Sequence, residues 1–281
     1  MIDLEPTLKR IRALLAEDTE QSATYAALEA RLALERVCYD RLQQHHDYIS
    51  SAQLRKWQPA AVINTLIAEV DEHAAVTRTF SVSKGPAIPG GNPADEEYVT
   101  VGTEVGFNPK LVGELWNALS GLALHVKLPK KRGDHIPDYG DACAIRTKVE
   151  EVLTELERLS QTTMTFSGFG PEVSFTCSCG EKNKRRAGLL KEGHSTFCIN
   201  PNCKASYRIT KDNDEFTFES ELTEVKCEKC NEVNSWPVRT FYSMKYDQTA
   251  SFNCRSCGSK NLVRWRLMRR VRPDGGPTAT P

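Results

Sequence analysis

The sequence predicts an α+β protein: an N-terminal all-α helical bundle followed by two small β modules. Three observations lead to this prediction. Apolar residues recur at helical spacing through most of residues 1–166. From Glu172 onward they alternate along short stretches, as they do in β-strands. Finally, eight of the ten cysteines lie in four close groups between Cys177 and Cys257.

Three helices are expected in the first part of the chain. The first begins near Asp3 and Pro6, because Asp is a common helix cap and Pro is tolerated in the first turn. The second runs from about Gln21 to Ile49, and the third from about Pro59 to His73. The apolar face expected for the long second helix consists of Tyr25, Leu28, Leu32, Val37, Leu42 and Tyr48.

Two long loops are expected within the helical half, near 81–98 and 128–141. Gly-Pro and Pro-Gly steps mark the first loop, and a short strand is expected at its start, over Thr79–Ser83. Two further helices are expected, over about Asn108–Val126 and about Ala142–Ser160. Asn108 and Pro109 provide a cap and a first position for the earlier one.

The pattern after Glu172 predicts short strands separated by turns. A hairpin is expected around Lys211–Asp214, where turn-forming residues join two alternating stretches. We therefore divide the chain into a helical domain over 1–166, a first β module over 172–222, a second over 223–271 and a disordered tail over 272–281. The expected strands are Val173–Cys177, Ser206–Thr210, Glu215–Glu219, Ser251–Cys254 and Asn261–Leu267.

The cysteine groups predict metal binding. Four thiolates arranged as a tetrahedron satisfy Zn²⁺, and two close pairs separated by roughly twenty residues commonly supply them. This arrangement occurs twice in tandem, so we expect two zinc ions. Four sulfur ligands leave no coordination position for a reacting water, which favours a structural role over a catalytic one. The predicted ligands are Cys177, Cys179, Cys198, Cys203, Cys227, Cys230, Cys254 and Cys257.

The second group resembles the zinc-ribbon family over about Val225–Val271. Cys227-x2-Cys230 and Cys254-x2-Cys257 match the two metal-binding turns, or knuckles, of that family. Gly258 follows the last cysteine directly, where such turns often need a positive φ. The resemblance implies a small antiparallel sheet folded around one zinc ion.

The first group also resembles a zinc ribbon, over about Val173–Thr210. It departs from the family pattern, since one knuckle is shortened to Cys177-x-Cys179 and the other is lengthened to Cys198-x4-Cys203. The departure leaves the exact ligand set open. In particular, His194 lies four residues before Cys198 and is an alternative ligand.

Composition narrows the class of protein. The formal net charge is zero, but the residues from Cys177 onward contain 19 Lys and Arg against 12 Asp and Glu. There is no apolar run long enough for a membrane helix, and the acidic N-terminus does not resemble a secretory signal. We therefore expect a cytoplasmic protein without a membrane partner, whose paired cysteines bind metal rather than form disulfides.

Our first functional prediction is a zinc-binding adaptor that binds DNA or RNA through the tandem module. Arginines and lysines contact phosphates, and Phe241, Tyr242, Tyr246 or Trp265 are candidates for base stacking. The alternative is a protein-docking subunit of a larger assembly. In either case the helical domain would mediate self-association or bind a protein partner. The candidate nucleic-acid-binding residues are Lys184, Arg185, Arg186, Lys260, Arg264, Arg266, Arg269 and Arg270.

A third interpretation concerns the stretch Arg41-Leu-Gln-Gln-His45-His46. Its Arg-x4-His spacing resembles the signature of HEPN ribonucleases, a helical family that dimerises to pair two such motifs. The resemblance implies that Arg41 and His46 would act around a scissile RNA phosphate. The sequence contains no phosphate-binding loop, dinucleotide fingerprint, nucleophile elbow or His-Glu-x2-His motif. We therefore expect a protein that is not an enzyme and has no catalytic residues.

Overall fold

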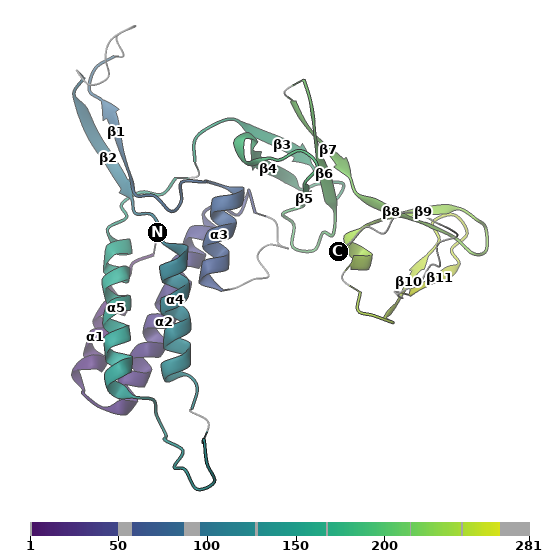
Figure 1. Ribbon diagram of the computed structural model, residues 1–281. Helices are drawn as coiled ribbons and strands as arrows, with labels where there is room; N and C mark the ends of the chain where they lie inside the picture. Colours follow the sequence, from purple (N-terminus) through teal and green to yellow (C-terminus); the bar gives the residue numbers. More distant parts are fainter. Residues whose placement is uncertain are drawn as a thin grey trace, which may run out of the picture. The chain divides into compact units, whose positions relative to one another are not determined.

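The computed structural model describes residues 2–49, 58–86, 96–126, 129–166, 168–213, 215–242 and 244–264. It combines helices with small antiparallel sheets, which confirms the α+β class (Figure 1). The chain divides into two compact units. The first comprises Met1–Thr176, Gly180–Lys191 and Ile199–Pro201, and the second Cys177–Cys179, Glu192–Cys198 and Asn202–Pro281. The predicted tail over 272–281 lies outside the described residues.

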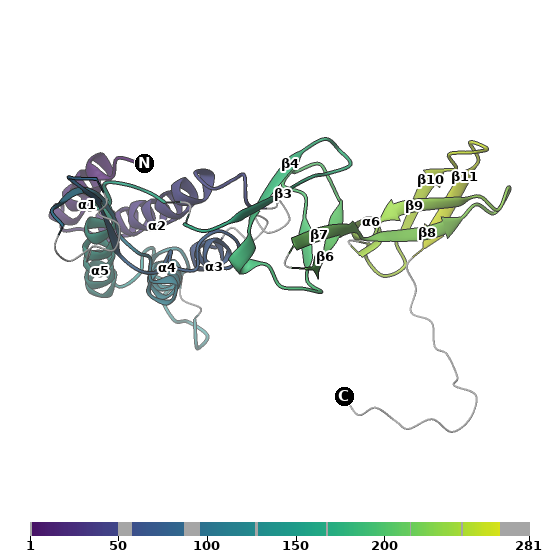
Figure 2. The ribbon, with the colours of Figure 1, turned by 90° about the horizontal axis from the view of Figure 1, so that it is seen from above.

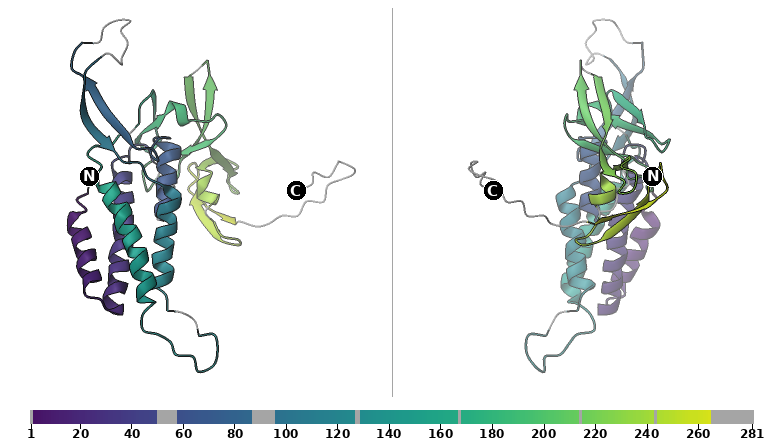
Figure 3. Two further views of the ribbon diagram at one scale, coloured as in Figure 1. Left: turned by 60° about the vertical axis from the view of Figure 1, so that its left-hand side comes forward. Right: turned by 90° about the vertical axis from the view of Figure 1, so that its right-hand side faces the viewer.

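The predicted helices of the first unit are present, with shifted ends. Four of them lie side by side and share one apolar core (Figures 1 and 3). The second ends at Gln43, earlier than expected. Asn108 caps its helix as predicted, since its side chain accepts a hydrogen bond from the Leu111 N–H. The helices are α1 (Glu5–Ala16), α2 (Glu20–Gln43), α3 (Pro59–Glu69), α4 (Pro109–Ala123) and α5 (Ala142–Ser160).

The predicted buried face of the second helix is correct only in its later part, where Val37 and Leu42 pack against the core and Tyr48, beyond the end of α2, is buried. Tyr25, Leu28 and Leu32 are 48%, 38% and 41% exposed. The core is instead contacted by the opposite side of the helix, where small side chains let neighbouring helices approach closely. Periodicity of the large apolar residues therefore predicted the wrong side for the first half of α2 only. Its buried residues include Ala23, Ala26, Ala27, Ala30, Ala33, Leu34 and Cys38.

A β-hairpin corrects the expectation of an all-α first half. Strand β1 (Arg78–Ser83) pairs antiparallel with β2 (Tyr98–Glu104). The strand predicted at Thr79–Ser83 is confirmed, whereas β2 was not predicted and overlaps the predicted loop near 81–98 only at Tyr98. Alternation of Val with Tyr and Thr over 98–103 suits a strand. Residues 87–95 of that loop, and residue 128 of the second one, lie outside the described part of the chain.

A second hairpin, β3 (Glu172–Thr176) with β4 (Lys182–Arg186), also belongs to the first unit. Two of its side chains, Glu172 and Arg186, contact Tyr48 in the region after α2. The Arg186 guanidinium lies 2.9 Å from the Glu172 carboxylate, and the Tyr48 hydroxyl donates to that carboxylate at 2.7 Å. Arg186 also donates to the Tyr48 hydroxyl at 3.2 Å, so the three groups form a closed network.

The second unit consists of short strands. Strands β5 (Ser195–Phe197), β6 (Ser206–Asp212) and β7 (Glu215–Ser220) form one antiparallel sheet in that order. Two hairpins follow, β8 (Leu222–Lys226) with β9 (Val233–Pro237), and β10 (Thr249–Asn253) with β11 (Lys260–Arg264); Figure 2 shows them side by side. The short helix α6 (Arg239–Tyr242) lies between the hairpins in sequence.

Membrane-spanning helices were sought in the described residues. None of these helices has both the length and the apolar content that crossing a bilayer requires.

Candidate metal centres

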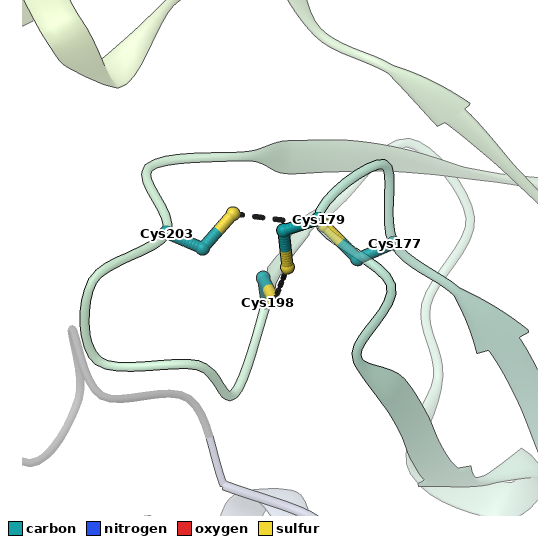
Figure 4. A group of neighbouring side chains, drawn as sticks. All are labelled: Cys177, Cys179, Cys198 and Cys203. Carbon is teal, nitrogen blue, oxygen red and sulfur yellow. Dashed lines mark hydrogen bonds between the residues drawn. The ribbon is translucent and has the colours of Figure 1, made fainter.

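The first centre is formed by Cys177, Cys179, Cys198 and Cys203. Figure 4 shows the four side chains converging from two segments, the turn that carries Cys177 and Cys179 and the loop that carries Cys198 and Cys203. The Sγ atoms of Cys177 and Cys203 lie 3.6 Å apart, as do those of Cys179 and Cys198. A tetrahedral site with Zn–S bonds of about 2.3 Å has sulfur–sulfur edges of about 3.8 Å. The observed spacing therefore fits four sulfurs around one zinc ion.

The second centre is formed by Cys227, Cys230, Cys254 and Cys257. Its corresponding Sγ distances are 3.7 Å for Cys227 with Cys257 and 3.6 Å for Cys230 with Cys254. In each centre all four sulfurs lie within 4.8 Å of one another. Each group could hold one metal ion, which is consistent with the predicted two zinc sites. When bound, zinc would crosslink the turns that carry the sulfurs.

His194 is not part of either centre. Its side chain is exposed, while four sulfurs already complete the first group. The backbone oxygen of His194 accepts a hydrogen bond from the Ile209 N–H at 2.8 Å, which is a strand contact. The geometry thus favours the four-cysteine set among the alternatives that the sequence left open.

Two buried asparagines brace the second centre, and sequence reasoning missed both. Asn261 on β11 accepts from the Glu228 N–H at 3.0 Å and donates to the Cys227 sulfur at 3.4 Å. It therefore fixes the knuckle between β8 and β9 from the neighbouring hairpin. Hydrogen bonds to a ligating sulfur orient it and stabilise its thiolate form.

Asn234 on β9 makes the reciprocal contact. Its side chain accepts from the Arg255 N–H at 3.0 Å and donates to the Cys254 sulfur at 3.6 Å. Each hairpin of the second centre thus supplies a carboxamide to the knuckle of the other. The two asparagines are 1% and 6% exposed, so these hydrogen bonds are shielded from water.

The first centre is braced in a related way. Asn183 accepts from the N–H of Ile199, the residue after Cys198, at 2.9 Å. The Tyr207 hydroxyl accepts from the Ser178 N–H at 3.2 Å and donates to the Cys177 sulfur at 3.1 Å. Tyr207 therefore makes with a phenol the pair of contacts that Asn261 makes with a carboxamide.

A sequence signal for these braces exists. In every knuckle the bracing side chain stands four residues after the second cysteine, which gives Cys179 with Asn183, Cys203 with Tyr207, Cys230 with Asn234 and Cys257 with Asn261. Three of these second cysteines are followed by a residue with positive φ. These residues are Gly180 (φ 89), Asn231 (φ 57) and Gly258 (φ 69), the last as predicted.

The leading cysteine of each centre has an acidic thiol. Burial by itself would raise the pKa of Cys177, but hydrogen bonds from the Cys179 backbone and the Tyr207 hydroxyl lower this pKa to about 6. For Cys227, the Cys230 backbone N–H is the main cause, and Asn261 adds to it; the pKa falls to about 6. Both groups are thus predisposed to the thiolate form that a metal requires.

The predicted nucleic-acid-binding residues separate into three sets. Lys184, Lys260 and Arg264 are exposed. Arg185 and Arg186 are only 2% and 7% exposed, so these two guanidinium groups have little access to a phosphate. Arg185 lies 5.8 Å from the centre of the Phe175 ring, and Arg186 is paired with Glu172. The remaining candidates, Arg266, Arg269 and Arg270, lie outside the described residues.

The candidate stacking residues are likewise distributed. Tyr242 and Tyr246 are 74% and 73% exposed, whereas Phe241 is 8% exposed. Trp265 lies beyond the described part of the chain. Only the two tyrosines therefore offer an open ring among the described candidates.

Arg41 and His46 do not converge on an exposed site. Arg41 is 6% exposed and forms an ion pair with the buried carboxylate of Glu104. Arg78 binds the same carboxylate at 2.7 Å. The His46 side chain is 73% exposed and lies 2.8 Å from Asp47. This geometry assigns Arg41 a role within the fold and lends no support to the ribonuclease interpretation.

Comparison with known proteins identifies no relative, since the chain matches no protein-family model, no curated protein and no solved structure. The functional argument therefore rests on the geometry of the chain itself.

Proposed function

We propose that this protein is a zinc-binding adaptor whose second unit binds nucleic acid. The observation that carries the proposal is the exposed face of the β10–β11 hairpin. Lys260 and Arg264 stand at its two ends, about 13 Å apart along an extended strand. Their direct partners on β10, Asn253 and Thr249, are neutral; the Arg264 guanidinium also lies 3.9 Å from the exposed Asp247 carboxylate, a long ion pair that a phosphate can replace. Cations with adjacent neutral donors suit contacts to successive phosphates.

Metal is integral to this proposal. A two-stranded hairpin of five-residue strands is marginal in water by itself, and the apolar contacts of β10–β11 are few. The Trp236 and Phe252 rings, 5.4 Å apart, supply part of the packing between the hairpins. Zinc would fix the two knuckles and thereby hold Lys260 and Arg264 in one arrangement.

The proposal is tested by measuring the salt dependence of nucleic-acid binding by the zinc-loaded full chain. Removing two phosphate contacts with Lys260→Ala/Arg264→Ala should weaken binding and reduce the slope of log affinity against log salt by about 1.5. Lys9→Ala/Lys110→Ala is the matched control, because it removes the same charge from exposed positions on the helices. Equal affinity and slope in both double variants would refute the proposal.

A second candidate function, self-association through the helical unit, is favoured by one observation. Tyr25, Leu28 and Leu32 form an exposed apolar stripe on α2 at helical spacing. Such a stripe suits packing against a like helix. Light scattering should then give a dimer mass that falls to the monomer mass in Tyr25→Ser/Leu28→Ser/Leu32→Ser, with unchanged helical circular dichroism. A monomeric wild-type chain would rule this function out.

A further inference from the structure

A groove of about 610 Å³ lies within the second unit, on the β5–β6–β7 sheet and beside α6. Its volume is in the range of about 300–1,000 Å³ that holds small organic ligands. The groove residues are Ser195, Phe197, Ser206, Arg208, Glu219, Ser220, Glu221, Leu222, Val238, Arg239 and Tyr242. Most of them are polar or charged, which distinguishes the groove from the apolar pockets that anchor protein partners.

Strand alternation separates this groove from the first metal centre. Tyr207 and Ile209 are buried, and the Tyr207 hydroxyl bonds to the Cys177 sulfur. Ser206 and Arg208, which alternate with them along β6, line the groove, because successive side chains of a strand point to opposite faces. The same strand that braces the metal therefore forms the floor of the groove.

The floor contains an unsatisfied polar group. Ser206 is 2% exposed and its hydroxyl has no hydrogen-bond partner. A buried hydroxyl without a partner costs about 1–3 kcal/mol, which a bound ligand would recover. Ser206 thus marks the position at which a polar atom of a ligand is needed.

The walls carry groups that recognise a nucleotide. The Tyr242 ring is 74% exposed and open for stacking. The Arg239 guanidinium lies 4.7 Å from the centre of the Phe197 ring, so a cation and an aromatic ring lie in contact at the groove. Arg208 is exposed and lies 3.8 Å from Glu221, a long ion pair that a phosphate can replace.

The carboxylates argue for a base rather than for phosphates alone. Ser195 donates to Glu221 at 2.7 Å, and Glu219 stands opposite Arg208 on the neighbouring strand. A carboxylate repels phosphate but accepts hydrogen bonds from the amino group of a nucleobase. An unpaired base offers such donors together with a face that stacks on an aromatic ring.

We propose that this groove binds an unpaired nucleobase of single-stranded nucleic acid, stacked on Tyr242, with Arg208 on a neighbouring phosphate. This inference deepens the proposed function and rests on it, since it assumes that the second unit binds nucleic acid. It adds a preference for single strands over duplexes. The Lys260 and Arg264 face supplies affinity for phosphates, and the groove distinguishes single strands from duplexes.

The test compares anisotropy titrations of labelled single-stranded oligonucleotides, RNA and DNA, with titrations of the matching duplexes. Loss of stacking, worth about 1–3 kcal/mol per base, should make Tyr242→Leu bind single strands about 5- to 150-fold more weakly. Duplex binding should not change. Tyr242→Phe keeps the ring and should retain wild-type affinity. Because the side chain is largely exposed, neither substitution removes core packing.

The outcomes separate the two proposals. Weakened single-strand binding in Tyr242→Leu but not in Tyr242→Phe supports the groove assignment. Wild-type binding in Tyr242→Leu, with loss in Lys260→Ala/Arg264→Ala, overturns the groove and leaves the proposed function standing. A wild-type chain that binds neither strands nor duplexes overturns both. Loss of a co-purifying protein in Tyr242→Leu, with unchanged nucleic-acid affinity, would assign the groove to a protein partner instead.

Discussion

The two metal centres use the same bracing scheme on different cysteine spacings. In the second centre both knuckles are Cys-x2-Cys, each followed by a positive-φ residue and then by an asparagine four residues after the second cysteine. In the first centre one knuckle is shortened and the other is lengthened. The position of the brace is nevertheless kept. Knuckle spacing therefore differs between the two centres, whereas the offset of the bracing residue from the second cysteine does not.

The exception lies at the lengthened knuckle, Cys198-x4-Cys203. Lys204 follows its second cysteine without a positive φ, and Tyr207 takes the place of an asparagine. A phenol can accept one hydrogen bond and donate another, as a carboxamide can, but it reaches farther from the backbone. The brace therefore requires a hydrogen-bond donor and an acceptor on one side chain rather than a particular residue type.

Metal removal should have the largest effect. It tests whether the folding of the second unit depends on the metal at its cysteine groups. Excess chelator should unfold the second unit, because its short sheets bury too little apolar surface to fold alone. The helices of the first unit, which share their own core, should persist. Elemental analysis should find two zinc ions per chain before treatment. If the β8–β9 and β10–β11 hairpins still gave dispersed amide signals in NMR spectra after complete zinc removal, the second unit would not need metal to fold.

Acid should destabilise the helical core of the first unit through a histidine, independently of the cysteine groups of the second unit. Burial, reinforced by the nearby Arg41, lowers the pKa of His45 from 6.5 to about 4 despite Asp71. Neutral His45 therefore stabilises the fold fully above pH 6.5, and this contribution, up to about 3 kcal/mol, is lost as pH falls towards 4.

The measurement is urea unfolding of the helices followed by circular dichroism between pH 7 and about 4. His45→Leu removes the titrating group and should flatten the dependence over this range. His46→Leu is the matched control, since the His46 side chain is largely exposed. An equally steep acid dependence in His45→Leu would show that other groups are responsible.

Substitution of the braces should weaken one centre at a time. Removing a hydrogen bond to a ligating residue typically costs about 10–100-fold in metal affinity. Tyr207→Phe should therefore lower the affinity for the first zinc ion only, and Asn261→Ala for the second only. Competition with a chromogenic chelator gives the two affinities. Tyr242→Phe, which removes an exposed hydroxyl, is the control. An equal loss of affinity at both metal centres in Tyr207→Phe would show that this residue does not brace the first centre alone.

The smallest expected effect concerns the turn residues. Gly258 has φ 69, where an added Cβ meets no atom within 4 Å but strains the backbone. Gly258→Ala should cost about 1 kcal/mol of stability. Asn231→Gly should be neutral or slightly stabilising at its positive φ, whereas Lys204→Gly should destabilise, since Lys204 does not need that conformation. Thermal melts of the zinc-loaded chain would rank the stabilities of the three variants.

Much of the candidate site could be predicted because the residues that bind metal are recognisable by type. Cysteines in close pairs have few alternative roles in a chain of this kind, so their spacing predicted the two groups of four sulfurs that the structure brings together and that could each hold a metal ion. The braces were missed because Asn and Tyr have many roles. Only their common offset of four residues from a cysteine distinguishes Asn183, Tyr207, Asn234 and Asn261.

The sequence by itself determined the α+β class, most of the helices and the two groups of four sulfurs, because each follows from local pattern or residue chemistry. Tertiary structure alone decided which face of α2 is buried, since packing against four other helices favours small alanines over Leu28 and Leu32. It also decided that Arg185 and Arg186 are buried while Lys260 and Arg264 are exposed. A basic residue has the same chemistry in both places, and only its neighbours determine whether a ligand can reach it.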